Sequence, residues 1–468
     1  MSHLDELNIF NLGTNSKVHF IGIGGISMSG LAEILLGRGV FVSGSDITES
    51  NITNRLKSLG AEIYIGQRAS NIKPCDLIVY TAAIKEDNEE FAAARASGIK
   101  MVTRAKMLGE IMRAYKYAVA VSGTHGKTST TSMVTHIMLK ADTDPTVSIG
   151  GELPAIGGNI RVGKSDYFVC EACEYCESFL NFYPYIGIIL NVDEDHLDYY
   201  KGINHIIRAF GGFAALPPKS GALVINSDDT NTLQAAKNAN AKVITCSKEN
   251  KGADYYAGEI EFDNGGFASY TLYERGKLLG IINLSVAGEH NILNSLCAIA
   301  ATRYLGLSFA AIKAGVESFS GVDRRFQRKG EVCGGAQLID DYAHHPTEIA
   351  ATLKTALRLC TGTVWCVFQP HTYTRTKALY NEFVKVLSVD GVCPVLLDIY
   401  AAREKDTGLV SSAQLSDDIH GSVYMPDFES CADYLRKNVK RGDIVLTMGA
   451  GTVYRVGDIL LCERRDDK

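Results

Sequence analysis

The segment Tyr117–Thr128 reads YAVAVSGTHGKT, in which an apolar strand pattern runs into a turn with two glycines. A helical pattern led by threonine and serine follows as far as Leu139. Glycines let backbone N–H groups curl round a phosphate, a helix start adds positive potential, and a lysine adds a point charge. We therefore expect a nucleotide here, with an ordinary Gly-rich turn as the alternative. The residues expected to contact it are Gly123, Thr124, His125, Gly126, Lys127, Thr128 and Ser129.

This loop is shorter than the usual phosphate loop, which carries one more glycine at the position held here by Val121. The same order of strand, turn and helix occurs twice more. Lys17–Ile21 precedes a glycine turn and a helical pattern over Ser29–Leu36, and Gln337–Ile339 precedes a helix over Pro346–Leu359. Strands that alternate with helices predict an α/β protein with parallel sheets.

A chain of 468 residues is too long for a single hydrophobic core. The basic, turn-like segment Ser320–Arg328 follows a helical pattern over Ser308–Phe319 and is the best break. With a second boundary near residue 107, the expected domains are 1–107, 108–322 and 323–468. We expect the outer two to be Rossmann-like and the central one to resemble P-loop ATPases, with a mainly parallel sheet. Pro217–Pro218 and Lys248–Asn264 are predicted to be loops within the central domain.

Composition indicates a cytoplasmic, globular protein. The net charge of −6 gives no reason to expect nucleic acid or an anionic membrane surface as a partner. No apolar run approaches the ~18–20 residues of a membrane span, and the first residues, MSHLDELNIF, lack the features of a signal peptide. Twelve cysteines in such a chain are expected to be reduced thiols.

A second glycine turn, Gly22–Ser27, follows the first strand pattern, and Asp46 closes the next strand pattern 19 positions beyond Ser27. This is nearly the dinucleotide fingerprint, but Ser27 stands where the last glycine belongs. The pattern predicts a diphosphate over a helix start, with Asp46 placed for a ribose. NAD and a UDP-sugar both fit this pattern, and plain packing is the alternative. The later phosphate loop argues against the dehydrogenase interpretation, because a redox enzyme has no need of ATP.

Acidic and histidine side chains follow two predicted strands beyond the phosphate loop. Glu171 lies near the end of Asp166–Ala172, and His196 lies in the acidic segment after Ile186–Val192. Active sites of α/β proteins gather at the carboxyl ends of strands, where carboxylates suit Mg²⁺ that also contacts phosphates. The hydroxyl of Thr128 can ligate the same kind of ion. A hydrogen-bonded loop histidine in a solvated turn is the alternative.

Cys170, Cys173 and Cys176 have the spacing that begins an iron–sulfur motif. The fourth cysteine would fall at position 180, which is Leu180, and Cys170 lies inside a predicted strand. We therefore expect small thiols packed near a strand end. A nucleotide-binding regulatory module that senses redox state through these cysteines is the alternative.

Taken in order, these motifs resemble those of the Mur ligase family, from about residue 17 to residue 456. The run GIGGISMSG at 22–30 is similar to the family's UDP-muramoyl site, and GTHGKT at 123–128 to its shortened ATP loop. Glu171 falls at the metal-bridging glutamate and NVDEDHLD at 191–198 at the metal-binding histidine. The later matches are GEHN at 288–291 with Asn294, DRRF at 323–326, DDYAHHPTE at 340–348, QPH at 369–371 and YTR at 373–375.

The resemblance implies the activity of the alanine-adding members: ATP- and Mg²⁺-dependent ligation of L-alanine to the carboxylate of UDP-N-acetylmuramate through an acyl phosphate, in peptidoglycan precursor synthesis. Lys127 would hold the β/γ-phosphates, Mg²⁺ would lie on Thr128 and Glu171, and a second Mg²⁺ near Glu171 and His196. His344 or a neighbour would take the amine's proton. The implied UDP-sugar contacts are Gly22, Gly24, Gly25, Met28, Ser29 and Asp46; those of ATP include His290, Asn291, Asn294, Arg325 and Asp341; those of the amino acid are Tyr342 and Arg375.

Two positions depart from the family's pattern. Thr372 stands where many alanine-adding members have arginine, so recognition of the amino acid's carboxylate would rest on Arg375. Cys173 holds a position that is commonly acidic. The plain alternatives are N-capping for His290 and Asn291, a solvated charge pair for Arg324 and Arg325, and a surface arginine at 375.

The competing functions are a family member that joins a recycled peptide to the same UDP-sugar, and an NAD-dependent dehydrogenase. We expect a monomer or a weak homodimer.

Overall fold

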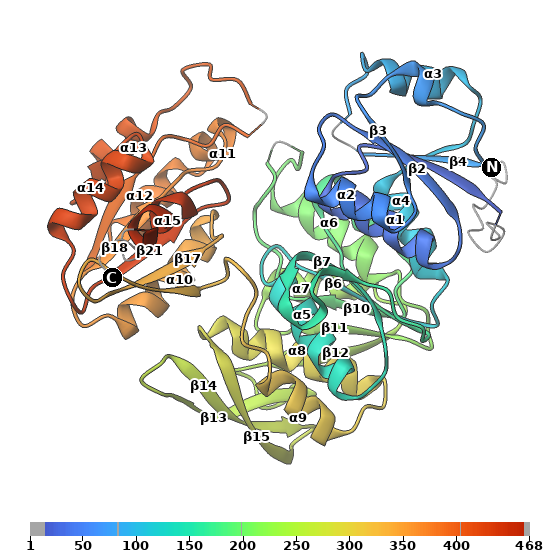
Figure 1. Ribbon diagram of the computed structural model, residues 1–468. Helices are drawn as coiled ribbons and strands as arrows, with labels where there is room; N and C mark the ends of the chain where they lie inside the picture. The colour runs from blue at the N-terminus through green and yellow to red at the C-terminus, as the bar shows by residue number, and fades with distance from the viewer. Residues whose placement is uncertain (1–14, 82–83, 198, 403, 463–468) are drawn as a thin grey trace. The chain divides into compact units, whose positions relative to one another are not determined.

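The computed structural model describes residues 15–81, 84–197, 199–402 and 404–462 (Figure 1). The chain forms two compact units: the first is Met1–Val192, Ile207–Cys246 and Cys297–Val316, and the second is Asp193–Ile206, Ser247–Leu296 and Glu317–Lys468. The prediction about a signal peptide concerns residues 1–10, which lie outside the described residues. Within the described ranges, no helix is both long enough and apolar enough to cross a membrane.

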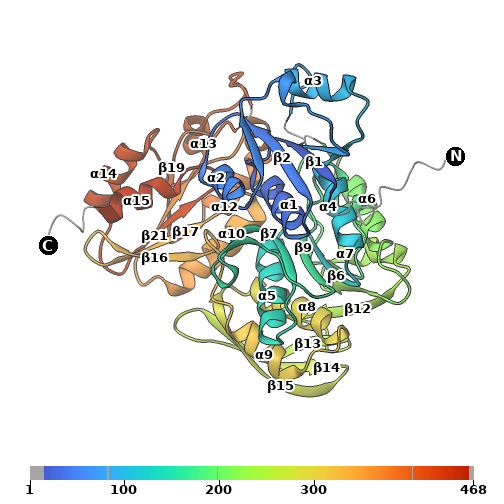
Figure 2. The same ribbon diagram turned by 45° about the vertical axis from the view of Figure 1, so that its right-hand side comes forward.

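The N-terminal part of the first unit is a parallel sheet with strand order β3-β2-β1-β4-β5. Strand β1 (Lys17–Ile21) pairs with β2 (Phe41–Asp46) on one side and β4 (Leu77–Tyr80) on the other, so the strand order reverses at its end, where ligands bind in such sheets. Helices α1 (Ile26–Gly37) and α2 (Asn51–Ser58) lie side by side (Figures 1 and 2). The other elements are β3 (Glu62–Ile65), β5 (Met101–Thr103), α3 (Glu89–Ala96), α4 (Arg104–Arg113) and a 3₁₀ turn over Ala69–Asn71.

The first unit also holds a sheet with strand order β12-β11-β10-β6-β9-β7-β8, parallel except at its β7–β8 edge. Its central strand β6 (Tyr117–Ser122) lies between β10 (Ile186–Ile189) and β9 (Tyr167–Glu171), and α5 (Lys127–Lys140) follows it. Nearly all of β6 is buried, as expected for a parallel strand covered on both faces. The remaining elements are β7 (Thr146–Leu153), β8 (Gly158–Arg161), β11 (Ala222–Asn226), β12 (Lys242–Ser247), α7 (Thr230–Ala235), and 3₁₀ turns over Pro154–Ile156, Tyr175–Asn181 and Ala236–Asn238. Helices α6 (Ile203–Ala214), α8 (His290–Tyr304) and α9 (Phe309–Glu317) have residues in both units.

The second unit contains an antiparallel group, β13 (Tyr255–Phe262), β14 (Phe267–Glu274) and β15 (Lys277–Ala287). It also contains a sheet with order β16-β17-β21-β18-β19-β20, in which only β16 is antiparallel. Its strands are β16 (Gln327–Val332), β17 (Ala336–Asp341), β18 (Val364–Phe368), β19 (Val392–Leu396), β20 (Val423–Tyr424) and β21 (Ile444–Met448). Its helices are α10 (Pro346–Leu359), α11 (Tyr373–Ala378), α12 (Tyr380–Leu387), α13 (Ser412–Asp418), α14 (Phe428–Asn438) and α15 (Tyr454–Cys462).

Two hydrophobic clusters cover the two faces of this last sheet. Leu446 of β21 belongs to the cluster that includes Ile349 and Leu353 of α10, whereas its neighbour Val445 belongs to the cluster that includes Leu435 of α14. Successive side chains of a strand point to opposite faces, so an apolar run such as β21 is buried from both sides.

The three predicted strand–turn–helix units are confirmed as β1–α1, β6–α5 and β17–α10, although α1 begins at Ile26, earlier than Ser29. The prediction of a loop over Lys248–Asn264 is wrong, because strand β13 occupies Tyr255–Phe262. Its glutamates, Glu259 and Glu261, are exposed, and an antiparallel strand can carry polar side chains toward water.

Candidate active site

The phosphate loop of the first unit leaves the central strand β6 through two glycines with positive φ. Gly123 has φ of 144° and Gly126, the N-cap of α5, has φ of 83°. A side chain at Gly123 would also meet Leu190, whose Cβ lies 2.9 Å from an ideal Cβ. Both positions therefore need glycine for conformation, and one of them needs it for space as well.

Asn191 clamps this loop. Its Oδ1 accepts a hydrogen bond from the N–H of His125 at 2.8 Å, and its Nδ2 donates to the carbonyl of His125 at 3.0 Å. The N–H of Thr124 donates to the carbonyl of Asn191 at 3.1 Å. Three hydrogen bonds from one residue beyond β10 thus fix the shape of the loop. Asn191 belongs to the quoted metal-segment motif, but sequence reasoning gave it no role.

Lys127 folds back over its own loop. Its Nζ donates to the carbonyls of Gly123 at 2.6 Å and Thr124 at 3.0 Å, and lies 2.9 Å from Oε2 of Glu174. Burial disfavours the ammonium, but the neighbouring carboxylates, that of Glu174 foremost, hold the pKa of Lys127 above its usual value. Glu174 is a second residue that sequence reasoning missed, and only its place shortly after Glu171 could have pointed to it.

Glu171 ends strand β9 and pairs in register with Val121 of β6, immediately before the loop. Its Oε1 accepts the N–H of Gly150 at 2.8 Å, and a Cβ on Gly150 would come within 2.8 Å of Oε2. The structure therefore brings Glu171 to the same sheet edge as the loop. Thr128 and Ser129 lie in the first turn of α5, with Thr128 buried.

The N-terminal glycine turn leaves β1 at Gly22, whose φ is 83°. The N–H of Gly24 donates to Oδ2 of Asp46 at 2.8 Å, so this carboxylate holds the turn itself. Gly25 caps α1, while Met28 and Ser29 are buried in that helix, where the hydroxyl of Ser29 donates to the carbonyl of Ile26. The structure thus brings the expected UDP-sugar residues together at the end of β1.

His196 belongs to the second unit and has a left-handed backbone, with φ of 53°. Its N–H donates to Oδ1 of Asp195 at 2.7 Å, and the same oxygen accepts from the guanidinium of Arg375 at 2.8 Å. Despite burial, the charges of His196 and Arg375 hold the pKa of Asp195 well below its usual range. Arg375 also lies 3.2 Å from Nδ1 of His371.

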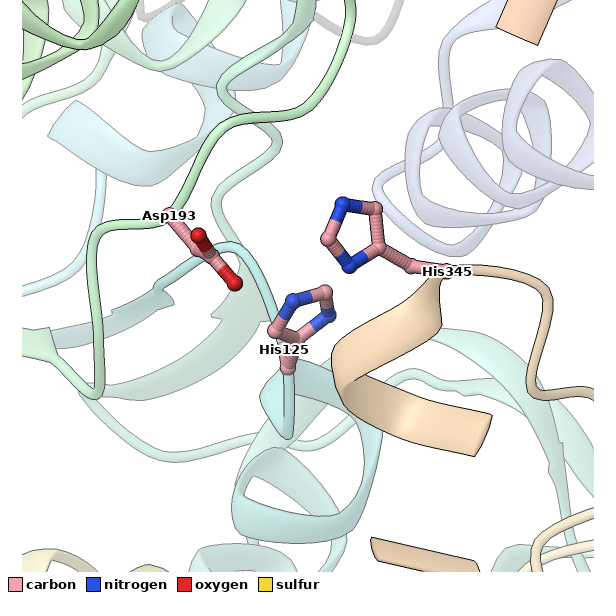
Figure 3. A group of neighbouring side chains, drawn as sticks. All are labelled: His125, Asp193 and His345. Atoms are coloured by element: carbon pink, nitrogen blue, oxygen red, sulfur yellow. The ribbon is translucent and has the colours of Figure 1, made fainter. Parts of the chain in front are cut away.

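His345 caps α10: its Nδ1 accepts the N–H of Thr347 at 3.3 Å, so its Nε2 carries the hydrogen and donates to the carbonyl of Glu194 at 2.8 Å. The hydroxyl of Thr347 donates to Oδ2 of Asp193 at 2.6 Å. Figure 3 shows the side chains of Asp193 and His345, and also labels His125 of the phosphate loop. Both contacts join the Asp193–Ile206 segment to the start of α10 within the second unit.

The motif around Asp341 organises the segment that leads into β16. Oδ2 of Asp341 accepts the N–H of Phe326 at 3.0 Å, and burial raises its pKa to about 6. Arg324 donates to Oδ2 of Asp340 and to the carbonyl of Gly449, whereas Arg325 lies 3.7 Å from Glu348. Arg324 therefore makes the closer contacts within the protein, and the guanidinium of Arg325 is the one better placed to contact a ligand.

His344 and Tyr342 follow β17. The ring of His344 packs edge-on against Tyr342, and its Nδ1 lies 3.1 Å from the carbonyl of Tyr342. Burial lowers the pKa of His344 to about 4, so the imidazole is neutral at neutral pH.

The GEHN motif spans the start of α8, which begins at His290. Asn291 and Asn294 are buried. Nδ2 of Asn294 donates to Oδ1 of Asn291, and Nδ2 of Asn291 donates to the carbonyl of Ala287. His290 is exposed at the helix start. Glu289 pairs with Lys248 at 2.6 Å and with Lys354 at 2.9 Å.

The cysteine run is not a ligand cluster. Cys170 is buried, Cys173 is half-buried and Cys176 is exposed. Within the part of the chain that the structure describes, their sulfurs are not gathered as a potential metal site. Burial raises the pKa values of the Cys170 and Cys173 thiols, which fits packed, protonated side chains.

Sequence models of the Mur ligase family match three parts of the chain. The model of the catalytic domain matches residues 17–116, that of the middle domain 121–302, and that of the glutamate ligase domain 324–451. Two curated relatives are both named UDP-N-acetylmuramate–L-alanine ligase. The one from Acetivibrio thermocellus is 51% identical over 466 residues, 99% of each chain. The one from Clostridium acetobutylicum is 52% identical over 452 residues, 96% of this chain and 98% of the relative.

Solved structures are similar over the same length. A crystal structure of the UDP-N-acetylmuramate–alanine ligase of Thermotoga maritima gives a TM-score of 0.78 at 28% identity, covering 97% of this chain and 100% of that one. A murein peptide ligase from Psychrobacter arcticus gives a TM-score of 0.69 at 24% identity, covering 96% and 98%. The second is a likeness of fold alone.

Proposed function

Because the chain belongs to the Mur ligase family, we propose that it joins L-alanine to the carboxylate of UDP-N-acetylmuramate with cleavage of ATP, as a step in peptidoglycan precursor synthesis. The observation that carries the proposal is the near-complete alignment with L-alanine ligases at about half identity. The family is ATP-dependent, and these relatives favour alanine as the acceptor over a recycled peptide, and a ligase over a dehydrogenase.

The reaction needs ATP because oxide is a poor leaving group. A carboxylate oxygen of the substrate takes the γ-phosphoryl group, and ADP leaves. The neutral amine of L-alanine then attacks the acyl carbon, phosphate leaves, and the nitrogen loses a proton. Such transfers ask the protein mainly for positioning and for neutralisation of charge.

In the first unit, the phosphate loop supplies both the positioning and the neutralisation of charge. Backbone N–H groups between Gly123 and the start of α5, held by the Asn191 clamp, are suited to a triphosphate. Lys127 places a half-buried cation beside them. Thr128 and Glu171 offer a hydroxyl and a carboxylate at the same sheet edge, and this all-oxygen set suits Mg²⁺. When bound, Mg²⁺ would neutralise the charge on the phosphates.

For the UDP-sugar we propose the glycine turn after β1, with Gly22, Gly24 and Gly25 as its backbone contacts. Asp46 would act by holding this turn through the N–H of Gly24. Met28 and Ser29 are buried, so their expected contribution is through the helix start that they pack.

In the second unit, His290, Asn291, Asn294, Arg325 and Asp341 remain proposed ATP contacts, and His196 a proposed Mg²⁺ ligand. Tyr342 and Arg375 remain proposed contacts of the amino acid. The ion pair of Arg375 with Asp195 keeps the guanidinium in place for a carboxylate. His344 is neutral at neutral pH and can accept the amine's proton, although burial makes it a weak base.

We further propose that the domain boundaries lie near residues 107 and 323, and that the protein is a cytoplasmic monomer or weak homodimer. The twelve free cysteines support a reducing compartment.

An acceptor screen tests the proposal. Purified protein is mixed with UDP-N-acetylmuramate, ATP and Mg²⁺, and ADP release is followed with L-alanine, L-serine, glycine or a peptide. Release with L-alanine is expected to exceed the others. Release only with a peptide, or none with any acceptor, would refute it.

A further inference from the structure

Lys127 has no hydrogen-bond donor to spare as the structure stands. An ammonium group has three N–H donors. Two point to the carbonyls of Gly123 and Thr124, at 2.6 and 3.0 Å, and the third points to the carboxylate of Glu174, with N–O distances of 2.9 and 3.1 Å. A phosphate oxygen can gain a bond from Lys127 only if one of these bonds is given up.

The bond to Glu174 differs from the other two. The carbonyls belong to the loop itself, whereas Glu174 lies 47 positions away along the chain. The residue is 3% exposed, so its negative charge is poorly screened by water. A bound triphosphate would compete with this carboxylate for the lysine and would also be repelled by it.

The backbone of Glu174 is held by the turn that follows it. It begins the 3₁₀ turn Tyr175–Asn181, and the N–H of Glu177 donates to its carbonyl at 2.9 Å. Within this turn Phe179 is fully buried, and its ring stacks on Phe213 with centroids 5.1 Å apart. The backbone that carries this carboxylate is therefore held by the turn, and the side chain itself is only 4% exposed beside Lys127.

We propose that Glu174 competes with a nucleotide for Lys127. Its carboxylate occupies the place that a nucleotide phosphate takes on the lysine, and a nucleotide must displace it to bind. Glu174 is then a positioning residue that keeps the half-buried lysine charged and ordered before a nucleotide binds, and it weakens nucleotide binding. This inference rests on the proposed function only in that the loop binds a nucleotide.

The test is calorimetric titration of ADP, without divalent cations, into the full-length protein and its Glu174→Gln variant. The glutamine keeps the shape and removes the charge, so the ADP dissociation constant should fall by roughly three- to thirtyfold. The matched control is Glu152→Gln, which removes an exposed carboxylate on β7 and should leave the constant unchanged. An unchanged or larger constant in Glu174→Gln overturns the proposal.

A double-mutant cycle separates competition for Lys127 from simple repulsion between Glu174 and the phosphates. In a Lys127→Met background, Glu174→Gln should tighten ADP binding less than half as much as in the native background, because the competition for the lysine is gone. If Glu174→Gln tightens ADP binding as much in the Lys127→Met background as in the native one, the proposed competition for Lys127 is overturned. If Glu174→Gln fails to fold, as judged by thermal unfolding, Glu174→Asp shortens the reach by one carbon and should tighten binding in the same direction.

Failure of the native protein to bind ADP both without divalent cations and with Mg²⁺ present would contradict the proposed function and this inference together. Native binding with no change in Glu174→Gln contradicts this inference alone.

Discussion

Asn191→Ala is expected to loosen the phosphate loop. The substitution removes two side-chain hydrogen bonds to His125, at 2.8 and 3.0 Å. A typical bond contributes ~0.5–1.5 kcal/mol net, so the free energy of unfolding should fall by ~1–3 kcal/mol. A loop without its clamp must be ordered when the nucleotide binds, so part of the same energy is lost from binding.

Calorimetry of ADP binding and urea unfolding measure the two effects. A loss of ~1 kcal/mol or more in binding corresponds to a dissociation constant raised about fivefold or more. The matched control is Asn240→Ala, which removes an exposed hydrogen bond to the carbonyl of Ala215 in the same unit and should leave ADP affinity unchanged. If Asn191→Ala lowers stability but alters the dissociation constant less than twofold, the clamp has no part in holding phosphate.

Three further predictions concern single residues. Lys127→Ala should abolish ADP release while the protein still unfolds cooperatively, whereas Lys140→Ala, exposed at the end of α5, should keep normal turnover; near-normal turnover of the first variant would refute the loop assignment. Glu171→Ala should shift the Mg²⁺ titration of activity steeply upward, and an unchanged titration would remove Glu171 from the metal site. Hydrogen bonds from two lysines lower the pKa of Glu289 to about 2, from 4.5, so its ion pairs stabilise the protein above pH 4.5 and cease to do so as the pH falls through 2. Glu289→Gln should therefore lower the free energy of unfolding by ~1–2 kcal/mol at pH 7; urea unfolding should show this difference shrinking between pH 4.5 and 2, and a pH-independent difference would contradict the assignment.

The fold could be predicted where local sequence and tertiary structure agree. The apolar run of β6 and the glycines after it predict a buried strand that leads through a glycine turn into a helix, and all three are present. The fold class and the family are confirmed. Strand β13 could not be found in this way, because its exposed glutamates made the segment resemble a loop.

The candidate site could be predicted as motifs but not as contacts. Glu171 was placed correctly at a strand end beside the loop. Apart from its place shortly after Glu171, nothing in its local sequence distinguishes Glu174 from an ordinary turn residue. Its contact with Lys127 depends on the pairing of β6 with β9 and on the turn that contains the buried Phe179. Similarly, the role of Asp46 in holding Gly24 depends on how β2 pairs beside β1. Long-range pairing of this kind decides which polar side chains meet.

The most direct measurement is ADP release by the purified protein with ATP, Mg²⁺ and UDP-N-acetylmuramate, before and after L-alanine is added. We predict that release depends on both substrates and yields one UDP-N-acetylmuramoyl-L-alanine per ADP. ADP release that proceeds equally without the UDP-sugar or without L-alanine, or no release at all, would contradict the account.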